Sequence, residues 1–495
     1  MIMESERETG MVKERDDLEV AIIGAGMSGL LMAIRLEEAG IDRFRVFEKA
    51  SSVGGTWREN TYPGLTCDVP SFFYSYSFEP NPDWSHRFAP GHEIRAYFEG
   101  VAKKYDLHRR ISFGTEVSDA RYHDGGWSIE TRDRERVRAR FLVMATGPLH
   151  HKHIPDIPGL ERFAGDAFHT AAWNHDVSLE GKRIGIIGTG STAVQAATPL
   201  SKVASELTIF QRTAQWIFPI GNEAYSDAQR ARKHRFPFLA SLTRLFYKRL
   251  FEASSSAVVK EGFFRRRLSK GCRDHLATIA DPELREKLTP DYEPGCKRLV
   301  MSTEFYDTVQ RKNVHLEVSH IQQIESEGVR TEDGTLHELD VLVLATGFDP
   351  HAWGVEHVIG SEGRSLAQAW KEGTRTYRSL AMPGFPNLFF LAGPQCPLGN
   401  ISVIDVSETQ ASYILHCIEK LERDGLDEIE ATREATGAFN RSVKEAMKGT
   451  LWVTGCKSWY LDEEGDPVLW PWSARRFHRD LKRPDFAHYE LRSVA

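Results

Sequence analysis

Residues 18–29 read LEVAIIGAGMSG, and this stretch decides the fold. Its first six residues form a short apolar run of strand length, and the run at 30–40, LLMAIRLEEAG, has helical periodicity. Between them, Gly24 permits a tight turn, Gly26 lets the backbone approach a pyrophosphate, and Gly29 lets the helix pack closely on the strand. The GxGxxG spacing therefore predicts a dinucleotide-binding turn.

The next strand-like run, FRVFEKA at 44–50, supports this interpretation. It places Glu48 22 residues after Gly26, where a carboxylate is expected to accept a hydrogen bond from a ribose 2'-hydroxyl. A glycine-rich turn alone is a weak signal. The strand, the turn, the helix and the acid in this order make it much stronger.

The same arrangement occurs a second time. The apolar run KRIGII leads into GTGSTA at 188–193, with alanine at the third close-packing position, and ELTIFQRT then places Arg212 22 residues after Gly190. An acid suits a free 2'-hydroxyl, as in FAD or NADH, whereas arginine suits a 2'-phosphate, as in NADPH. The residues predict an FAD site first and an NADPH site second; an ordinary surface arginine is the alternative for Arg212.

Two further strand-like runs end in Ala-Thr-Gly, at 145–147 and at 345–347, and they indicate where a second dinucleotide fold leaves and re-enters its host. We expect an α/β protein with two nested dinucleotide-binding (Rossmann-type) domains and a helical insert. The expected segments are a flexible tail (1–16), a first FAD-binding part (17–150), a first NADPH-binding part (151–220), the helical insert (221–293), a second NADPH-binding part (294–346) and a second FAD-binding part (347–495).

The insert is basic and amphipathic, as in FPFLASLTRLFYKRLFE at 236–252. A helix of this kind can lie on a membrane surface. Most such stripes, however, are a core face backed by a solvated face, and we favour that interpretation.

The composition narrows the class of protein. A chain of 495 residues favours two or three domains, and its formal net charge of −7, from 70 acidic and 63 basic residues, disfavours nucleic-acid binding. No apolar stretch is long enough to predict a transmembrane helix, and the charged N-terminus does not resemble a secretory signal.

The six cysteines are far apart in sequence, without a CxxC pair or a nearby histidine at metal-ligand spacing. We therefore expect no metal site, reduced thiols and a cytoplasmic protein. The same scatter argues against a disulfide reductase, which needs two close cysteines. The residues concerned are Cys67, Cys272, Cys296, Cys396, Cys417 and Cys456.

Two longer motifs carry a resemblance to a known family. Residues 163–173, FAGDAFHTAAW, match the fingerprint FxGxxxHxxxW of the Baeyer-Villiger monooxygenases, although Asn174 follows where that fingerprint has Pro or Asp. Residues 54–68, GGTWRENTYPGLTCD, resemble a second signature of the same class B flavoprotein monooxygenases, and the likeness runs from about Leu18 to at least Trp459. Enzymes of the wider family that oxygenate sulfur or nitrogen usually carry Tyr or Phe in place of Trp173.

The resemblance implies roles for individual residues. Arg298 is implied as the active-site arginine, Asp68 as its carboxylate partner, and Lys297 with Arg212 as the grip on the NADPH phosphate. Trp459 is implied to cover the substrate or the nicotinamide ribose, with a core position as the alternative. The flavin positions implied are Gly24, Gly26, Ser28, Gly29, Glu48, Gly55, Thr56, Trp57, Asp68, Tyr74 and Val117. The NADPH positions are Gly188, Thr189, Gly190, Ser191, Thr192, Ala193, Arg212, Thr213, Lys297 and Arg298.

The implied reaction uses NADPH, FAD and O2 to insert one oxygen atom beside a ketone carbonyl through a C4a-peroxyflavin, giving an ester or lactone. One alternative is a monooxygenase that oxidises sulfur or nitrogen, and a more distant one is a non-catalytic NADPH-binding protein. Trp173 and Arg298 argue against the first, and Asp68 with Arg298 argues against the second. His169 is expected in a linker between domains, as a hinge or as a satisfied buried histidine, without a role in proton transfer. The ketone and the oligomeric state stay open.

Overall fold

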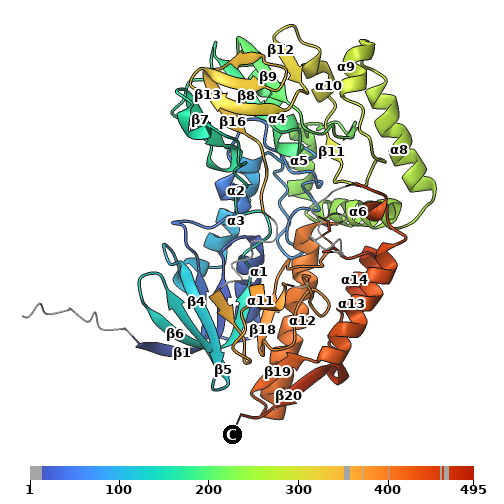
Figure 1. Ribbon diagram of the computed structural model, residues 1–495. Coiled ribbons are helices and arrows are strands. Elements are labelled where there is room, and N and C mark those ends of the chain that lie inside the picture. The colour runs from blue at the N-terminus through green and yellow to red at the C-terminus, as the bar shows by residue number, and fades with distance from the viewer. Residues whose placement is uncertain are drawn as a thin grey trace, which may run out of the picture.

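Two β-sheets organise the chain (Figure 1). The structure is a computed structural model, and it describes residues 14–349, 357–371, 373–397, 399, 401–456, 460–461 and 468–494. In the view of Figure 1, the sheet that contains β8 and β9 lies at the top, and the sheet that contains β1, β4, β5 and β6 lies at the lower left.

The first sheet has eight strands in the order β17-β4-β5-β6-β1-β2-β3, with β18 also paired to β6. The strands β6, β1, β2 and β3 are parallel, whereas β4, β5 and β6 form an antiparallel meander. The strands are β1 Glu14–Ile23, β2 Phe44–Phe47, β3 Ile111–Ser112, β4 Val117–His123, β5 Gly126–Thr131, β6 Arg136–Met144, β17 Val358–Ile359 and β18 Leu388–Phe390.

Helices α1 (Met27–Glu38) and α12 (Val403–Asp424) pack against each other beside this sheet. Their buried residues join the largest hydrophobic core, which also contains Val20 and Ile22 of β1. The remaining elements around the first sheet are α2 Thr56–Glu59, α3 Gly91–Lys104, α11 Leu366–Ala369, α13 Arg433–Met447, α14 Ala474–Asp480, β19 Glu428–Ala431 and β20 Tyr489–Arg492.

The second sheet has five parallel strands in the order β12-β9-β8-β16-β7. Its three central strands, β9, β8 and β16, are mostly apolar and buried, as expected of parallel strands that are covered on both faces, whereas the edge strands β12 and β7 are half polar. The five strands are β7 Asp166–His169, β8 Arg183–Ile187, β9 Glu206–Phe210, β12 Val314–Glu317 and β16 Val341–Leu344. The sheet is accompanied by helices α4 Ser191–Val203 and α10 Phe305–Val309. It is also accompanied by a three-stranded sheet (β13 Ile321–Glu325, β14 Gly328–Thr331 and β15 Leu336–Glu338) and by the pair β10 Ile217–Phe218 and β11 Val300–Met301.

The chain passes from the first sheet to the second after β6 and returns after β16, so the second fold is nested in the first. The two crossing segments pair with each other. Lys152 and Phe348 form an antiparallel bridge, His153 N donates to Gly347 O at 2.9 Å, and Asp349 N donates to His151 O at 2.8 Å. The predicted fold class, two nested dinucleotide-binding folds with a helical insert, is confirmed; the exact domain boundaries stay a prediction.

Five helices lie between residues 221 and 293: α5 Asp227–Arg235, α6 Phe238–Ser254, α7 Ser256–Val259, α8 Phe263–Leu276 and α9 Pro282–Lys287. The expectation that the apolar stripe of this insert is a core face is wrong for α6. Most of its leucines and phenylalanines face outward, although Phe251 packs against the largest core, and its inner face also carries Arg244 and Lys248, which pair with carboxylates of α12.

The expected tail also needs correction. Strand β1 begins at Glu14 and pairs with β6 from its first residue, with Glu14 opposite Arg136. Residues 14–16 of the expected tail therefore lie in β1, and residues 1–13 lie outside the described part of the chain.

Candidate functional site

A cavity of about 1530 Å³ lies between the two glycine-rich turns, and both sheets contribute to its walls. It brings together nearly all of the residues predicted from the sequence. The predicted flavin positions that line the cavity are Gly24, Gly26, Ser28, Glu48, Gly55, Thr56, Trp57, Asp68, Tyr74 and Val117. The predicted NADPH positions that line it are Gly188, Thr189, Gly190, Ser191, Thr192, Arg212, Thr213, Lys297 and Arg298.

Gly29 and Ala193, the third positions of the two motifs, do not line the cavity. A Cβ on Gly29 would lie 1.8 Å from the carbonyl oxygen of Gly24, and Ala193 is 2% exposed. Both residues lie where a helix packs onto the turn before it, which is the close-packing role expected of this position.

Each turn is also pressed against one of the Ala-Thr-Gly segments. Gly24 has φ +103°, and a Cβ there would meet the carbonyl oxygen of Ala145 at 2.7 Å. Gly188 has φ +119°, and its Cβ would meet the carbonyl oxygen of Ala345 at 2.5 Å. A side chain at either glycine is therefore excluded both by backbone strain and by lack of space.

Glu48, at the end of β2, braces the first turn. Its carboxylate accepts hydrogen bonds from Ala25 N at 2.8 Å and from Ala50 N at 2.9 Å, and Arg58 lies 3.3 Å away. Glu48 is buried and lines the cavity, and these contacts hold its carboxylate in place beside the turn. A carboxylate fixed in this way suits recognition of a ribose hydroxyl.

Two backbones approach each other at the floor of the first turn. A Cβ on Gly55, which has φ +52°, would lie 3.1 Å from the Cα of Gly26. Both residues line the cavity, so main chain rather than side chain faces the space beside the N-terminus of α1. Such a cradle fits a pyrophosphate, which is bound by backbone N–H groups and the helix dipole.

Two cationic side chains follow the second turn. Burial lowers the pKa of Lys297, the charge of Asp291 opposes this shift, and the like charge of Arg212 adds to it. The Lys297 ammonium lies 4.7 Å from the centre of the Tyr292 ring. Because Arg212 and Lys297 both line the cavity and repel each other, a dianionic phosphate between them would be stabilised.

Arg298 and Asp68 form an ion pair on the cavity wall. Arg298 Nε donates to Asp68 Oδ2 at 3.0 Å, and Nη2 donates to the same oxygen. The charge of Asp68 raises the pKa of the Arg298 guanidinium above its ordinary value, against the effect of burial. The two side chains keep 35% and 26% of their surface exposed, so the arginine is permanently charged and still faces the cavity.

Trp57 and Tyr74 form an aromatic corner of the cavity near this pair. Trp57 Nε1 donates to the Tyr74 hydroxyl at 3.0 Å, and the rings meet edge to face with centres 5.6 Å apart. Burial raises the pKa of Tyr74 well above its ordinary value, so the phenol stays neutral. The corner therefore supplies shape rather than charge.

Comparison with known proteins identifies the family. Residues 17–359 match the family described as Flavin-binding monooxygenase-like. The chain belongs to this family. An uncharacterized monooxygenase of Mycobacterium tuberculosis is 46% identical over 477 residues, which is 96% of both chains. A Baeyer-Villiger monooxygenase of Streptomyces coelicolor is 40% identical over 96% of this chain and 93% of its own.

Solved structures agree with this assignment. An oxidized steroid monooxygenase bound to NADP has a TM-score of 0.86 at 31% identity, covering 97% of this chain and all of that one. A closed cyclohexanone monooxygenase has a TM-score of 0.85 at 29% identity, covering 96% and 99%. The predicted membership of the Baeyer-Villiger flavin monooxygenases is confirmed.

Sequence reasoning missed residues that fix this flavin-binding monooxygenase's two halves to each other. Gln195 on α4 accepts from the Tyr62 hydroxyl at 2.8 Å and donates to Thr66 O at 3.0 Å. A Cβ on Gly64 would lie 2.3 Å from Gln195 O. The 54–68 signature thus packs directly on the second nucleotide fold. In the sequence, the only sign of such a contact was that the 54–68 signature specifies so many residues.

Trp459, the last predicted site residue, lies outside the described part of the chain. The neighbouring Tyr460 is described and buried, and burial raises its pKa to about 12, while Arg298 lowers it and Asp68 raises it. Among the described residues there is no cluster of three or more His, Cys, Asp or Glu side chains that could hold a metal ion.

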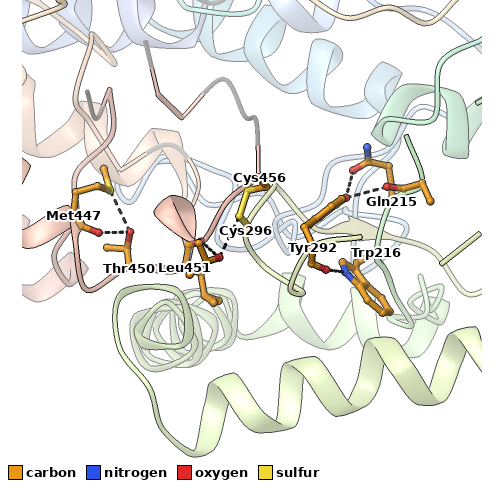
Figure 2. The surroundings of a disulfide bond; sticks show 10 residues. Gln215, Trp216, Tyr292, Cys296, Met447, Thr450, Leu451 and Cys456 are labelled. Carbon is orange, nitrogen blue, oxygen red and sulfur yellow. Dashed lines mark hydrogen bonds between the residues drawn. A yellow bond between two sulfur atoms is a disulfide. The ribbon is translucent and has the colours of Figure 1, made fainter. Parts of the chain in front are cut away.

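The expectation that all cysteines are reduced is wrong. Cys296 and Cys456 form a disulfide, with Cα atoms 6.1 Å apart, next to Lys297 and Arg298 (Figure 2). The four other cysteines are buried and form no disulfide. Cys296 and Cys456 are 160 residues apart in sequence, so spacing could not reveal that the fold brings them together.

The segment before Arg298 is thus held from two sides. On one side, Trp216 Nε1 donates to Tyr292 O at 2.6 Å and the Tyr292 hydroxyl donates to Gln215 Oε1 at 2.9 Å (Figure 2). On the other, the disulfide joins Cys296 to the residues that follow Leu451. These contacts restrict the positions of Lys297 and Arg298 on the cavity wall.

His169 is a satisfied buried histidine at the point where the chain re-enters the first fold. Ala171 N donates to its Nδ1, and its Nε2 bonds to Gly347 O, both at 3.0 Å. The geometry requires the neutral tautomer with the proton on Nε2. Burial lowers its pKa, although the hydrogen bond to Gly347 opposes this.

This arrangement predicts a pH dependence of stability. Because the pKa of His169 is lower in the folded state than the ordinary 6.5, the unfolded chain binds more protons below pH 6.5. The free energy of unfolding should therefore fall as the pH drops below 6.5, and this part of the slope should vanish in His169→Gln. Urea unfolding of both proteins at a series of pH values measures it. Identical slopes would contradict the assignment of His169.

Proposed function

We propose that this monooxygenase binds FAD along the first turn and NADPH along the second, and converts a ketone to an ester or lactone with one oxygen atom of O2. The observation that carries the proposal is the Arg298–Asp68 pair on the wall of the cavity that both turns line. Relatives named as Baeyer-Villiger monooxygenases and neighbours with FAD and NADP support it.

The first turn fits FAD. Glu48 suits an unphosphorylated ribose, and the bare backbone at Gly26 and Gly55 suits the pyrophosphate. The second turn fits NADPH rather than NADH, because Arg212 and Lys297 place two positive charges where a carboxylate would otherwise stand. When bound, the flavin supplies the hydride acceptance and the oxygen activation that no side chain provides.

Arg298 gives this site its oxygenation chemistry. The oxygen that attacks a ketone must first carry a negative charge, and the attack passes this charge to the former carbonyl oxygen. The guanidinium keeps its charge at any working pH and presents fixed donors to that anion. A lysine in a partly buried position could lose its charge.

Asp68 has the role of a positioning partner. Partial burial of an unpaired guanidinium costs several kcal/mol, on the order of the penalty for any buried charge. Asp68 offsets this cost, and because Nε and Nη2 both donate to Oδ2, it also fixes the plane of the guanidinium. Because the guanidinium plane is fixed, the other N–H donors of Arg298 also point in fixed directions.

The test is a reaction with the purified enzyme. A yellow protein that NADPH bleaches without oxygen would establish the two cofactors, and mass spectrometry with linear, cyclic and aryl ketones would detect the ester. Including one sulfide separates the alternative of heteroatom oxygenation. Bleaching with sulfoxide but no ester from any ketone would overturn the ketone assignment, and a colourless protein after reconstitution with FAD would overturn the flavin assignment.

A further inference from the structure

The outer face of α6 is an exposed apolar stripe. Phe238, Leu242 and Phe246 are 59%, 54% and 63% exposed, and Leu245 and Leu250 are exposed as well. These residues recur every three or four positions, so they form one continuous face of the helix over its whole length. A single exposed leucine needs no explanation, but a contiguous stripe of five large apolar side chains indicates a partner.

The stripe is not a core face that lacks its cover. The opposite face of α6 already packs on the protein, with Ala240 in the largest core, Phe251 packed against that core, and two cations against α12. Lys248 Nζ lies 2.7 Å from Asp405, and Arg244 lies 3.3 Å from Glu408 and 3.7 Å from Asp405. The helix therefore already buries one face, which combines apolar and cationic side chains, and the exposed stripe is a second apolar face.

Three further exposed phenylalanines lie on either side of α6 in the sequence. Phe236 precedes the helix, and Phe263 and Phe264 begin α8; all three are exposed. Helices α6 and α8 lie on the same side of the molecule in Figure 1. We call the residues 236, 238, 242, 245, 246, 250, 263 and 264 the α6 face.

The α6 face stands in strongly cationic surroundings. Residues 227–274 contain 13 Lys or Arg and four Asp or Glu, in a chain whose formal net charge is −7. Arg235, Arg249, Lys260, Arg266 and Arg267 are exposed. Positive charge is thus concentrated around the exposed apolar side chains, although the molecule as a whole is acidic.

We propose that the α6 face binds the surface of a bilayer that contains anionic phospholipids. A helix with leucine and phenylalanine on one side and arginine at its margins fits the boundary between acyl chains and phosphate headgroups. The cations complement the headgroup phosphates, which a second copy of this equally cationic surface would not do. None of the described helices is long and apolar enough to span a membrane, so the contact is with one leaflet.

Co-sedimentation with vesicles tests the proposal, and it does not depend on the reaction proposed above. The FAD-loaded full chain should bind vesicles of phosphatidylcholine with phosphatidylglycerol better than vesicles of phosphatidylcholine alone. Replacing Phe238 and Phe246 together by serine should lower the partition coefficient at least about tenfold. Arg266→Gln and Arg267→Gln should each lower binding to the anionic vesicles by roughly fivefold.

Matched controls lie elsewhere on the surface. Val318→Ser and Arg132→Gln change an exposed apolar and an exposed cationic residue outside the α6 face, and neither should alter vesicle binding. Flavin absorbance and NADPH oxidation of every variant in lipid-free buffer should equal those of the wild type.

Insertion has its own readout. An environment-sensitive dye on Phe246→Cys should shift to shorter wavelength with anionic vesicles, because position 246 enters the apolar layer; the native cysteines outside the disulfide are buried. No vesicle binding, or binding that the double phenylalanine variant retains in full, would overturn the proposal. So would a lipid-free dimer that this variant dissociates, because the α6 face would then belong to a second copy of the chain.

Discussion

Arg298→Ala is expected to separate reduction of the flavin from oxygenation of the ketone. The variant should still be reduced by NADPH at a measurable rate, because hydride transfer does not build an anion that Arg298 must hold. Ester formation should fall on the order of a hundredfold to a thousandfold, since loss of one preorganised charge costs about 3 to 4 kcal/mol of transition-state stabilisation. The NADPH consumed should then appear as hydrogen peroxide.

Stopped-flow reduction, product and peroxide assays on the same protein measure this effect. Asp68 is left without its partner in the variant, so flavin absorbance and thermal unfolding should be compared with those of Arg298→Lys, which keeps a charge but not the planar fork. Arg266→Ala, at an exposed arginine outside the cavity, is the matched control. An Arg298→Ala protein that makes ester at the wild-type rate would show that this arginine is not the catalytic residue.

Arg212→Ala is expected to raise the KM for NADPH roughly tenfold to a hundredfold and to leave the KM for NADH nearly unchanged. The reason is the loss of one charged contact to the 2'-phosphate, which is worth about 1.5 to 3 kcal/mol. The pKa of Lys297 should rise in the variant, because the like charge beside it is gone. Steady-state kinetics with both nucleotides measure the preference.

Arg162→Ala, at an exposed arginine outside the cavity, is the matched control. It should leave the ratio of the two KM values unchanged. If the wild-type enzyme used NADH as well as NADPH, the assignment of the second turn to NADPH would be wrong.

The two nucleotide turns could be predicted from sequence because their determinants are local. Each consists of a strand, a turn and a helix within about 30 residues, and the positions of the glycines follow from contacts inside that unit. Glu48 could be placed beside the first turn for the same reason: the next parallel strand must end at the same edge of the sheet. The nesting followed from the two Ala-Thr-Gly segments, which the structure presses against Gly24 and Gly188.

Contacts between distant segments could not be predicted in this way. Asp68 and Arg298 are 230 residues apart, and only the resemblance to a family suggested that they meet. No resemblance suggested that Cys296 and Cys456 meet. Their disulfide also weakens the expectation of a cytoplasmic location, because that expectation rested in part on reduced thiols. The orientation of α6 was misjudged because periodicity reveals that a helix has two faces, but not which of them packs inward.

The disulfide also closes the backbone into a covalent ring. Everything from Cys296 to Cys456 belongs to this ring, including strand β16 of the second sheet and helix α12 beside the first. A break in the backbone within the ring opens it but leaves one molecule, whereas a break before Cys296 or after Cys456 releases a fragment. Arg298 lies two residues inside the ring, so no single cut can detach it from α12.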